Sequence, residues 1–121
     1  MADQHVYLLI SGLPPGWTNE QRLTVRDSMH GLGLQEGTRP PLINHYVVSP
    51  DNNEMIFEAL FTDAEITDDA VFAMLSTALS LPEAAVRAVV NYSIFADGGT
   101  LQQSREAAQN YIIDNGWWAG G

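Results

Sequence analysis

Three threonines mark the predicted helix starts in this chain, because each stands at a position where its hydroxyl can cap the N-terminus of a helix. Thr18 and Thr100 are each followed three residues later by a glutamine, Gln21 and Gln103, which is the spacing of a capping box. In that motif the hydroxyl and the amide satisfy backbone N–H groups that have no partner inside the helix. Thr67 stands directly before two aspartates, which favour the positive end of a helix dipole. Three helices with defined starts are therefore expected.

The segments between these helices are typical of strands. Residues 6–13 form an apolar run that ends in a glycine and proline turn. Residues 43–49 and 55–61 predict a hairpin, because the turn formers Pro50-Asp51-Asn52-Asn53 join them. After Leu81-Pro82 interrupts the second helix, Pro82-Glu83 is expected to start a single further turn. Residues 87–95 then have the β-branched and aromatic content of a fourth strand.

The ends and faces of the helices can also be predicted. The first helix should run to about Gly31, where Gly31 and Gly33 supply its stop. One apolar face of the second helix follows the helical period: Val71, Leu75, Ala78 and Leu79. The last helix should reach residue 115, with Gly116 as the left-handed residue that lets Trp117 fold back on Ile112.

The predicted order is strand, helix, strand, strand, helix, strand, helix. Its first six elements match the ferredoxin-like βαββαβ plan, an α+β antiparallel sheet with helices on one face, and a C-terminal helix follows. A chain of 121 residues has the usual length of one domain, so residues 1–121 are expected to form a single domain with one core.

Charge restricts the partners of this domain more than any motif does. The chain has 15 acidic residues, five arginines and no lysine, for a formal net charge of −10. Binding of nucleic acid depends on cations that displace counterions from phosphates, and the arginines are dispersed along the chain. We therefore expect no direct binding of nucleic acid, and attraction to a basic protein partner.

Residues 6–21, VYLLISGLPPGWTNEQ, resemble the first strand, turn and helix start of an RNA-recognition motif. The resemblance supports the ferredoxin-like fold. In that family, aromatic rings on the first and third strands stack on bases, and basic residues accompany them. Here the aromatic position of the first strand falls on Leu9, and the third strand reads EMIFEALF, with Glu54 and Glu58 where cations would help. The fold is therefore expected without the RNA-binding function.

The residues that usually carry chemistry form no recognisable constellation. The chain has no cysteine, which removes thiol catalysis, thiolate zinc sites and disulfides. His5, His30 and His45 lack the short spacing of zinc ligands, and the acidic segment of residues 63–69 lacks the spacing of a calcium loop. No cofactor and no metal are expected. The alternative is a small cofactor-free oligomeric enzyme or ligand-binding regulator with a pocket between sheet and helices, in which His45 or Tyr46 would carry the proton.

Two adjacent indoles near the chain end, Trp117 and Trp118, cannot easily both be buried in one small core. Tryptophan is enriched at the energetic centre of interfaces, so these residues are candidates for contact with a partner. The complete set of interface candidates is Trp117, Trp118, Trp17, Glu54 and Glu58. Two arrangements remain open: the bare face of the sheet meets another molecule, or the last helix and the tail fold across it.

Taken together, the sequence predicts a non-catalytic acidic protein-binding module. A sharper hypothesis is an inhibitor or immunity-type protein, of the phage-encoded kind, that mimics nucleic-acid charge on a basic target. A homo-oligomer is expected. No apolar run approaches the roughly 20 residues of a membrane span, and the first residues lack the basic start of a signal peptide, so a cytoplasmic location without membrane contact is predicted.

Overall fold

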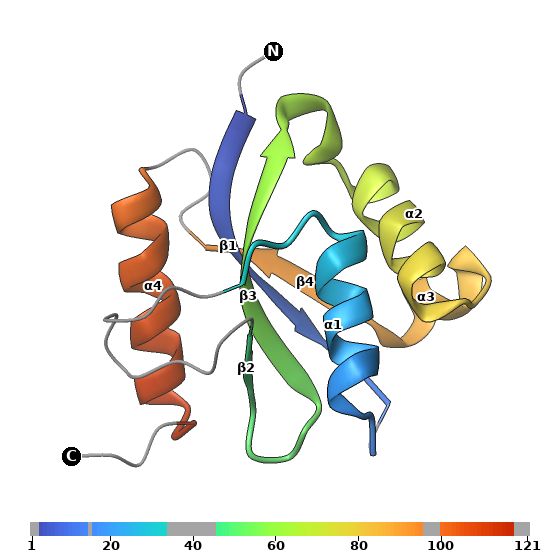
Figure 1. Ribbon diagram of the computed structural model, residues 1–121, viewed down its shortest axis with the longest axis horizontal. Helices are drawn as coiled ribbons and strands as arrows, with labels where there is room; N and C mark the ends of the chain where they lie inside the picture. The colour runs from blue at the N-terminus through green and yellow to red at the C-terminus, as the bar shows by residue number, and fades with distance from the viewer. Residues whose placement is uncertain (1–2, 15, 34–45, 96–99, 118–121) are drawn as a thin grey trace.

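The computed structural model describes residues 3–14, 16–33, 46–95 and 100–117. These residues form a mixed α+β fold in which helices cover both faces of a four-stranded antiparallel sheet (Figure 1). The strands are β1 (Asp3–Ser11), β2 (Val47–Val48), β3 (Glu54–Thr62) and β4 (Asn91–Ile94). The helices are α1 (Asn19–Ser28), α2 (Asp68–Leu79), α3 (Glu83–Val89) and α4 (Leu101–Asp114), and η1 (Asp63–Glu65) is a short 3₁₀ turn.

The sheet has the order β2-β3-β1-β4, so β1 and β3 lie at its centre. These two strands pair over nine residues each, from Asp3 opposite Thr62 to Ser11 opposite Glu54. β4 pairs with the second half of β1, and β2 pairs with the first half of β3. Because side chains alternate along a strand, the long central pair presents an apolar row to one face of the sheet and a mixed row, with Tyr7, Leu9 and Ile56 as its apolar part, to the other.

On one face, α1, α2 and α3 cover the larger core (Figure 1). Its central part consists of fully buried side chains from β1, β3, α1, α2 and α3: Leu8, Ile10, Met55, Phe57, Phe61, Val25, Val71, Leu75 and Val86. The predicted apolar face of α2 is confirmed, since Val71, Leu75 and Ala78 are buried and Leu79 packs against the same cluster.

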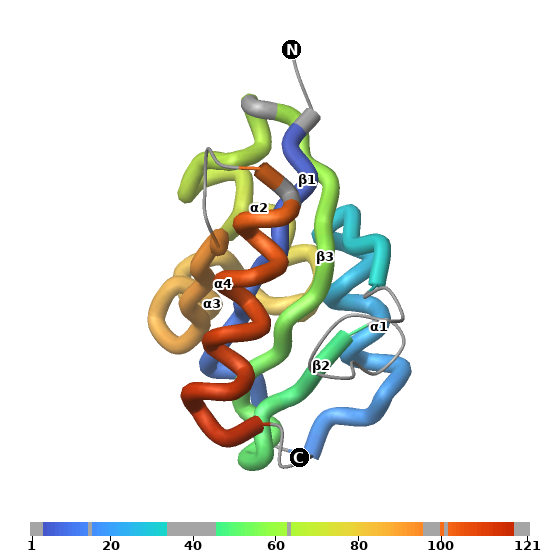
Figure 2. Tube along the Cα trace, turned by 90° about the vertical axis from the view of Figure 1, so that its left-hand side faces the viewer, coloured from blue at the N-terminus to red at the C-terminus, as the bar shows by residue number. Residues whose placement is uncertain are grey.

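On the opposite face, α4 lies across the sheet and covers a second, smaller core (Figure 2). Tyr7, Leu9 and Ile56 from the sheet meet Ala108 and Ile112 from the helix, and all five are buried. The sequence left open whether the last helix folds across this face. In the structure the helix does so within the same chain.

The predicted helix ends are confirmed in several details. Thr18 and Thr100 each form a complete capping box, and the Thr67 hydroxyl accepts a hydrogen bond from the Ala70 N–H group. Gly116 has a φ of 72°, and the Trp117 N–H group donates to the Ile112 carbonyl at 2.9 Å. This pattern is the Schellman motif, which turns the chain back onto the last helix.

The predicted fourth strand is wrong in its first half. Helix α3 occupies Glu83–Val89, and β4 is confined to Asn91–Ile94. The β-branched residues suggested a strand, but α3 buries Val86 completely while its other residues are exposed. The helical conformation buries Val86 in the larger core and leaves the other side chains of α3 in solvent. Tertiary packing therefore overrides strand propensity here.

Other predicted boundaries shift for local reasons. β1 begins at Asp3 and ends at Ser11 instead of running to residue 13, because Gly12 has a φ of 83° and so leaves the extended conformation. Glycine is required there, since a Cβ would lie 1.9 Å from the Val89 carbonyl oxygen. β2 is much shorter than the predicted strand 43–49, of which residues 43–45 lie outside the described part. The antiparallel pairing of β2 with β3 is confirmed.

Helix α1 ends at Ser28, before the predicted stop at Gly31. His30 takes the left-handed conformation, with a φ of 56°, and Gly31 then forms a bridge to Ala59 on the outer side of β3. A Cβ at Gly31 would lie 2.3 Å from Arg26 Cγ, 2.7 Å from the Arg26 carbonyl oxygen and 2.9 Å from the Phe57 ring. The glycine therefore lets the chain pass closely between the end of α1 and the sheet.

Among the described helices, none by itself combines the length and apolar character that crossing a membrane requires; α2 and α3 meet that test only together, across a bend of 101°.

Candidate functional site

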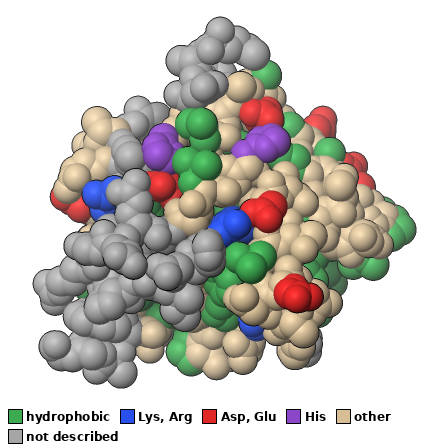
Figure 3. Space-filling model, in the orientation of Figure 1, with side chains coloured by type: hydrophobic (Ala, Val, Ile, Leu, Met, Phe, Trp, Pro, Cys, Tyr) green, Lys and Arg blue, Asp and Glu red, His purple; other side chains and the backbone are tan. Residues whose placement is uncertain are grey.

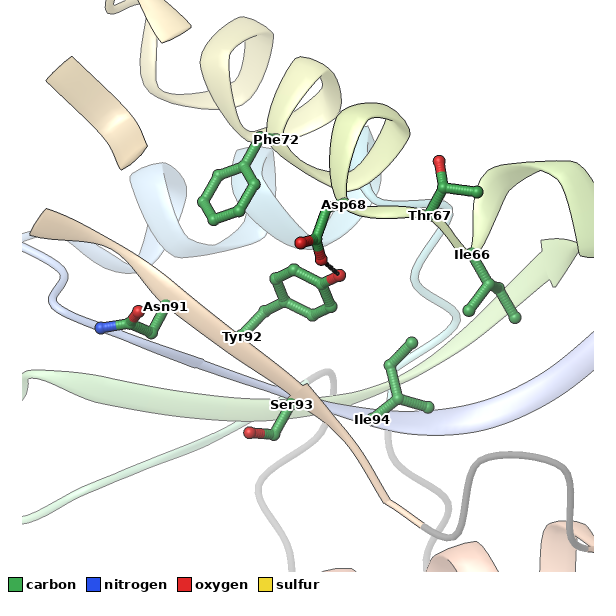
Figure 4. Close-up of a pocket in the computed structure, with 8 residues that line it drawn as sticks. All are labelled: Ile66, Thr67, Asp68, Phe72, Asn91, Tyr92, Ser93 and Ile94. Atoms are coloured by element: carbon green, nitrogen blue, oxygen red, sulfur yellow. Dashed lines mark hydrogen bonds between the residues drawn. The ribbon is translucent and has the colours of Figure 1, made fainter. Parts of the chain in front are cut away.

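A groove of about 560 Å³ lies between the start of α2 and the edge strand β4 (Figure 4). The two sides of the groove are the start of α2 and strand β4, and the local sequence explains the position of each. Thr67 caps α2, so that Asp68 falls in the first turn, and the alternation of β4 turns Tyr92 and Ile94 toward the helices. The lining residues are Ile66, Thr67, Asp68, Phe72, Asn91, Tyr92, Ser93 and Ile94.

The groove combines aromatic surface with one lining carboxylate, Asp68, and Asp69 lies next to it in the chain. The Tyr92 hydroxyl donates a hydrogen bond to Asp68, and the Tyr92 and Phe72 rings meet edge to face at 5.6 Å (Figure 4). The guanidinium of Arg87 lies 4.5 Å from the centre of the Phe72 ring and donates to Asp69 at 2.9 Å. Such an arrangement suits a cationic or hydrogen-bond-donating group, since carboxylates and aromatic faces both attract cations.

A second polar cluster lies beneath α4. The Glu58 side chain is 2% exposed, and its Oε2 lies 3.2 Å from His5 Nε2. Arg105 of α4 donates to the Tyr7 hydroxyl, and burial raises the pKa of Tyr7 despite that hydrogen bond. The cluster ties α4 to the sheet.

His30, which follows α1, and Glu65, in the η1 turn after β3, form a pair at the surface. Their side chains lie 2.7 Å apart beside a pocket of about 410 Å³ that also includes the exposed Leu32 and Leu60. The Thr62 N–H group and hydroxyl both donate to Glu65 and hold the pKa of its carboxyl below the usual range.

None of these sites has the composition of a metal centre. Within the ranges that the structure describes, no group of three or more histidine, aspartate or glutamate side chains is placed to hold a metal ion. The described histidines are instead arranged singly, each beside one carboxylate.

Two of the predicted interface residues lie near one another. Trp117 is half-buried against Tyr111, with ring centres 5.5 Å apart, and lines a surface hollow of about 340 Å³ together with Glu54. Glu54 accepts a hydrogen bond from the Tyr111 hydroxyl at 2.8 Å. Burial and that bond raise the pKa of Tyr111 to about 12. Contact of Trp117 and Glu54 with a partner stays a prediction.

The other predicted residues are dispersed. Trp17 packs on the opposite side of the sheet, between α1 and α2. Glu58 is buried, and Trp118 and His45 lie outside the described residues. Tyr46 is buried in the larger core, where its hydroxyl donates to Asn19.

From the sequence, Asp68 and Asp69 were placed at the positive end of a helix dipole, no calcium-loop spacing was found around them, and neither Phe72 nor Tyr92 was singled out. The available signal in the sequence was the alternation of polar Asn91 and Ser93 with apolar Tyr92 and Ile94, which is typical of a strand with one packed face. The pairing of Tyr92 with Asp68 crosses 24 residues, and no spacing rule predicts it.

The fold and the groove define an acidic α+β domain with a cleft at one sheet edge that is lined by one carboxylate, Asp68, and by aromatic and polar side chains. No protein-family model, no curated protein and no solved structure matches the chain.

Proposed function

We propose that this chain is a ferredoxin-like domain that acts as a non-catalytic acidic protein-binding module. The strand order β2-β3-β1-β4 and the placement of α1 and α2 on one face support the ferredoxin-like plan, with α3 and α4 as additions. On a basic target, the module occupies a surface that otherwise binds nucleic acid and imitates phosphate charge.

The observation that carries this proposal is the distribution of charge on the folded chain. Carboxylates are exposed on α1, α2, α3, α4 and the β2–β3 turn: Glu20, Asp27, Asp51, Asp68, Asp69, Glu83, Glu106 and Asp114. The arginines in the described part do not gather. Arg26 pairs with Asp27, Arg87 with Asp69, and Arg105 with Tyr7, while Arg22 donates to Asn52. Basic patches on the face in Figure 3 are accordingly small and separate.

The cover over the second sheet face supports the same proposal. In an RNA-recognition motif that face is where bases stack. Here α4 buries Tyr7, Leu9 and Ile56 on it. A polyanion would therefore meet carboxylates and a helix instead of an open aromatic sheet.

The test combines capture with competition. The tagged protein is incubated with lysate of its native host, and the captured partner is then purified and titrated directly. We expect a basic, nucleic-acid-binding partner whose affinity falls at least tenfold between about 50 mM and about 300 mM salt, because screening weakens the attraction. An oligonucleotide should compete with this protein for the partner.

Two results would contradict the proposal. One is partner affinity that does not change with salt. The other is direct binding of the oligonucleotide to the isolated protein at physiological salt with a Kd of about 1 μM or lower, because a domain with this charge should not attract phosphates.

A further inference from the structure

We propose that the groove between α2 and β4 binds an extended segment of the partner protein, which lies along β4 as an added strand and places lysine or arginine side chains beside Asp68. This inference rests on the proposed function and names its binding surface. Binding of this kind requires three features: an open strand edge, a cleft beside that edge, and charged side chains that select the segment that binds.

The edge comes from the sheet order. β4 is the terminal strand, and no strand in the described part of the chain pairs with its outer side. The Phe95 N–H group donates to the Tyr7 carbonyl at 3.0 Å. Because hydrogen-bonded and non-hydrogen-bonded pairs alternate in an antiparallel ladder, the N–H and C=O groups of Ile94, opposite Leu8, point away from β1. They are aimed at the position of a further strand.

The cleft beside this edge determines where the side chains of an added strand would lie. Residues opposite each other in a sheet share a face, so alternate side chains of the added strand would join Tyr92 and Ile94 on the α2 side. There they would meet the Phe72 ring and the first turn of α2 across the groove of about 560 Å³ (Figure 4).

Charge selects lysine or arginine for these positions. Asp68 and Asp69 are exposed at the rim, and Asp69 is 98% exposed. The nearest described cation, Arg87, contacts both Asp69 and Glu83, so carboxylates outnumber guanidinium groups around the groove. Because Arg87 already covers the Phe72 ring, a long cationic side chain would lay its aliphatic part along Ile66, Tyr92 and Ile94 and reach Asp68 with its head. This occupant is also the basic segment that the proposed function requires.

The experiment uses the full chain labelled with ¹⁵N and a peptide of about eight residues in which lysine and valine alternate, a length that spans β4. We expect binding in which the largest amide shift changes fall on Ile94, Asp68 and Phe72. A peptide that alternates glutamate and valine should not bind. A peptide that alternates lysine and proline keeps the charge but forms strands poorly, so it should bind at least threefold more weakly.

Matched variants locate the site. Asp68→Asn should weaken binding of the lysine–valine peptide about threefold to tenfold, as expected for one partly desolvated charge contact. Glu106→Gln removes the same charge from the exposed side of α4, across the sheet, and should change the affinity less than about twofold. Unfolding curves establish that both variants are folded.

The outcomes separate this inference from the proposed function. Equal affinity for the lysine–valine and lysine–proline peptides, or shift changes spread over other acidic surfaces, overturns strand addition at β4 while salt-dependent capture of a basic partner still supports the proposed function. A dimer of this chain whose contacts map to β4 also overturns it. Failure of the capture experiment, with no basic partner found, counts against the proposed function itself.

Discussion

Two hydroxyl groups of α4, those of Ser104 and Tyr111, form hydrogen bonds to the sheet in addition to the apolar packing of the helix. The Tyr7 N–H group lies where the β1–β4 ladder ends, and it donates to the Ser104 hydroxyl of α4 at 2.8 Å. At the other end of the helix, the Tyr111 hydroxyl donates to Glu54 of β3. Each bond satisfies a polar group that would otherwise be costly to bury, so these two residues hold the helix in register with the strands.

Tyr111 therefore makes stability depend on alkaline pH. Burial, followed by the bond to Glu54, raises the pKa of Tyr111 to about 12 from its ordinary value of 10.0. Because the folded-state pKa is the higher one, its contribution is complete below pH 10 and is lost as the pH rises through about 12. We expect the free energy of unfolding to fall less steeply over this range in Tyr111→Phe than in the native chain. Urea denaturation at a series of pH values measures both slopes, and equal slopes would contradict the assignment.

At the scale of elements, α3 shows that a short segment predicted in part as a strand can form a helix instead. Residues 87–89 belong to the predicted fourth strand, whose strand formers begin at Val89 and Val90, yet they continue a helix that begins after Pro82. Proline is well suited to the start of a helix, and Ala84 and Ala85 favour the helical conformation. Val86 then points into the core while Val89 is 58% exposed.

This difference between two valines can be measured. Val86→Ala should lower the free energy of unfolding by about 2 kcal/mol, because it removes fully buried apolar volume. Val89→Ala should raise it by about 0.5 kcal/mol, since alanine is the better helix former at an exposed position. Chemical denaturation provides both values. A loss of stability in Val89→Ala would indicate that residues 87–89 are extended, as their sequence suggests.

At the scale of the whole molecule, two cores share one sheet. The larger core lies under α1, α2 and α3, and the smaller one lies under α4. Carboxylates cover the outside of both layers. Because helices of the same chain cover each face of the sheet, the proposed binding uses an edge of the sheet, at β4 and the start of α2, instead of an open face.

Because α4 covers the smaller core, a charged substitution on its buried side should destabilise the protein. Ala108 is 1% exposed against the sheet, so Ala108→Asp would bury an unpaired carboxylate and should lower the free energy of unfolding by about 3 kcal/mol or more. Binding of a hydrophobic dye should rise as the smaller core becomes accessible. Asn110→Asp adds the same charge at an exposed position of the same helix and should change neither measurement. Equal behaviour of the two variants would show that α4 does not cover the sheet.

The sequence by itself determined the local features of this protein. The Thr18 and Thr100 capping boxes, the Gly116 turn and the β2–β3 hairpin follow from residues within a few positions of one another, so their patterns can be recognised directly. The net charge was likewise available without any structure.

Only the tertiary structure decided what depends on contacts between distant segments. Burial of Val86 favours the helix that continues through residues 87–89, and a bridge between Gly31 and Ala59 of β3 accompanies the early end of α1. The choice of α4 as the cover of the second sheet face depended on packing against β1, about 100 residues away in sequence. The groove at Asp68 and Tyr92 formed in the same way. Such contacts are set by which surfaces can be buried together, and this is a property of the folded chain rather than of any short stretch of it.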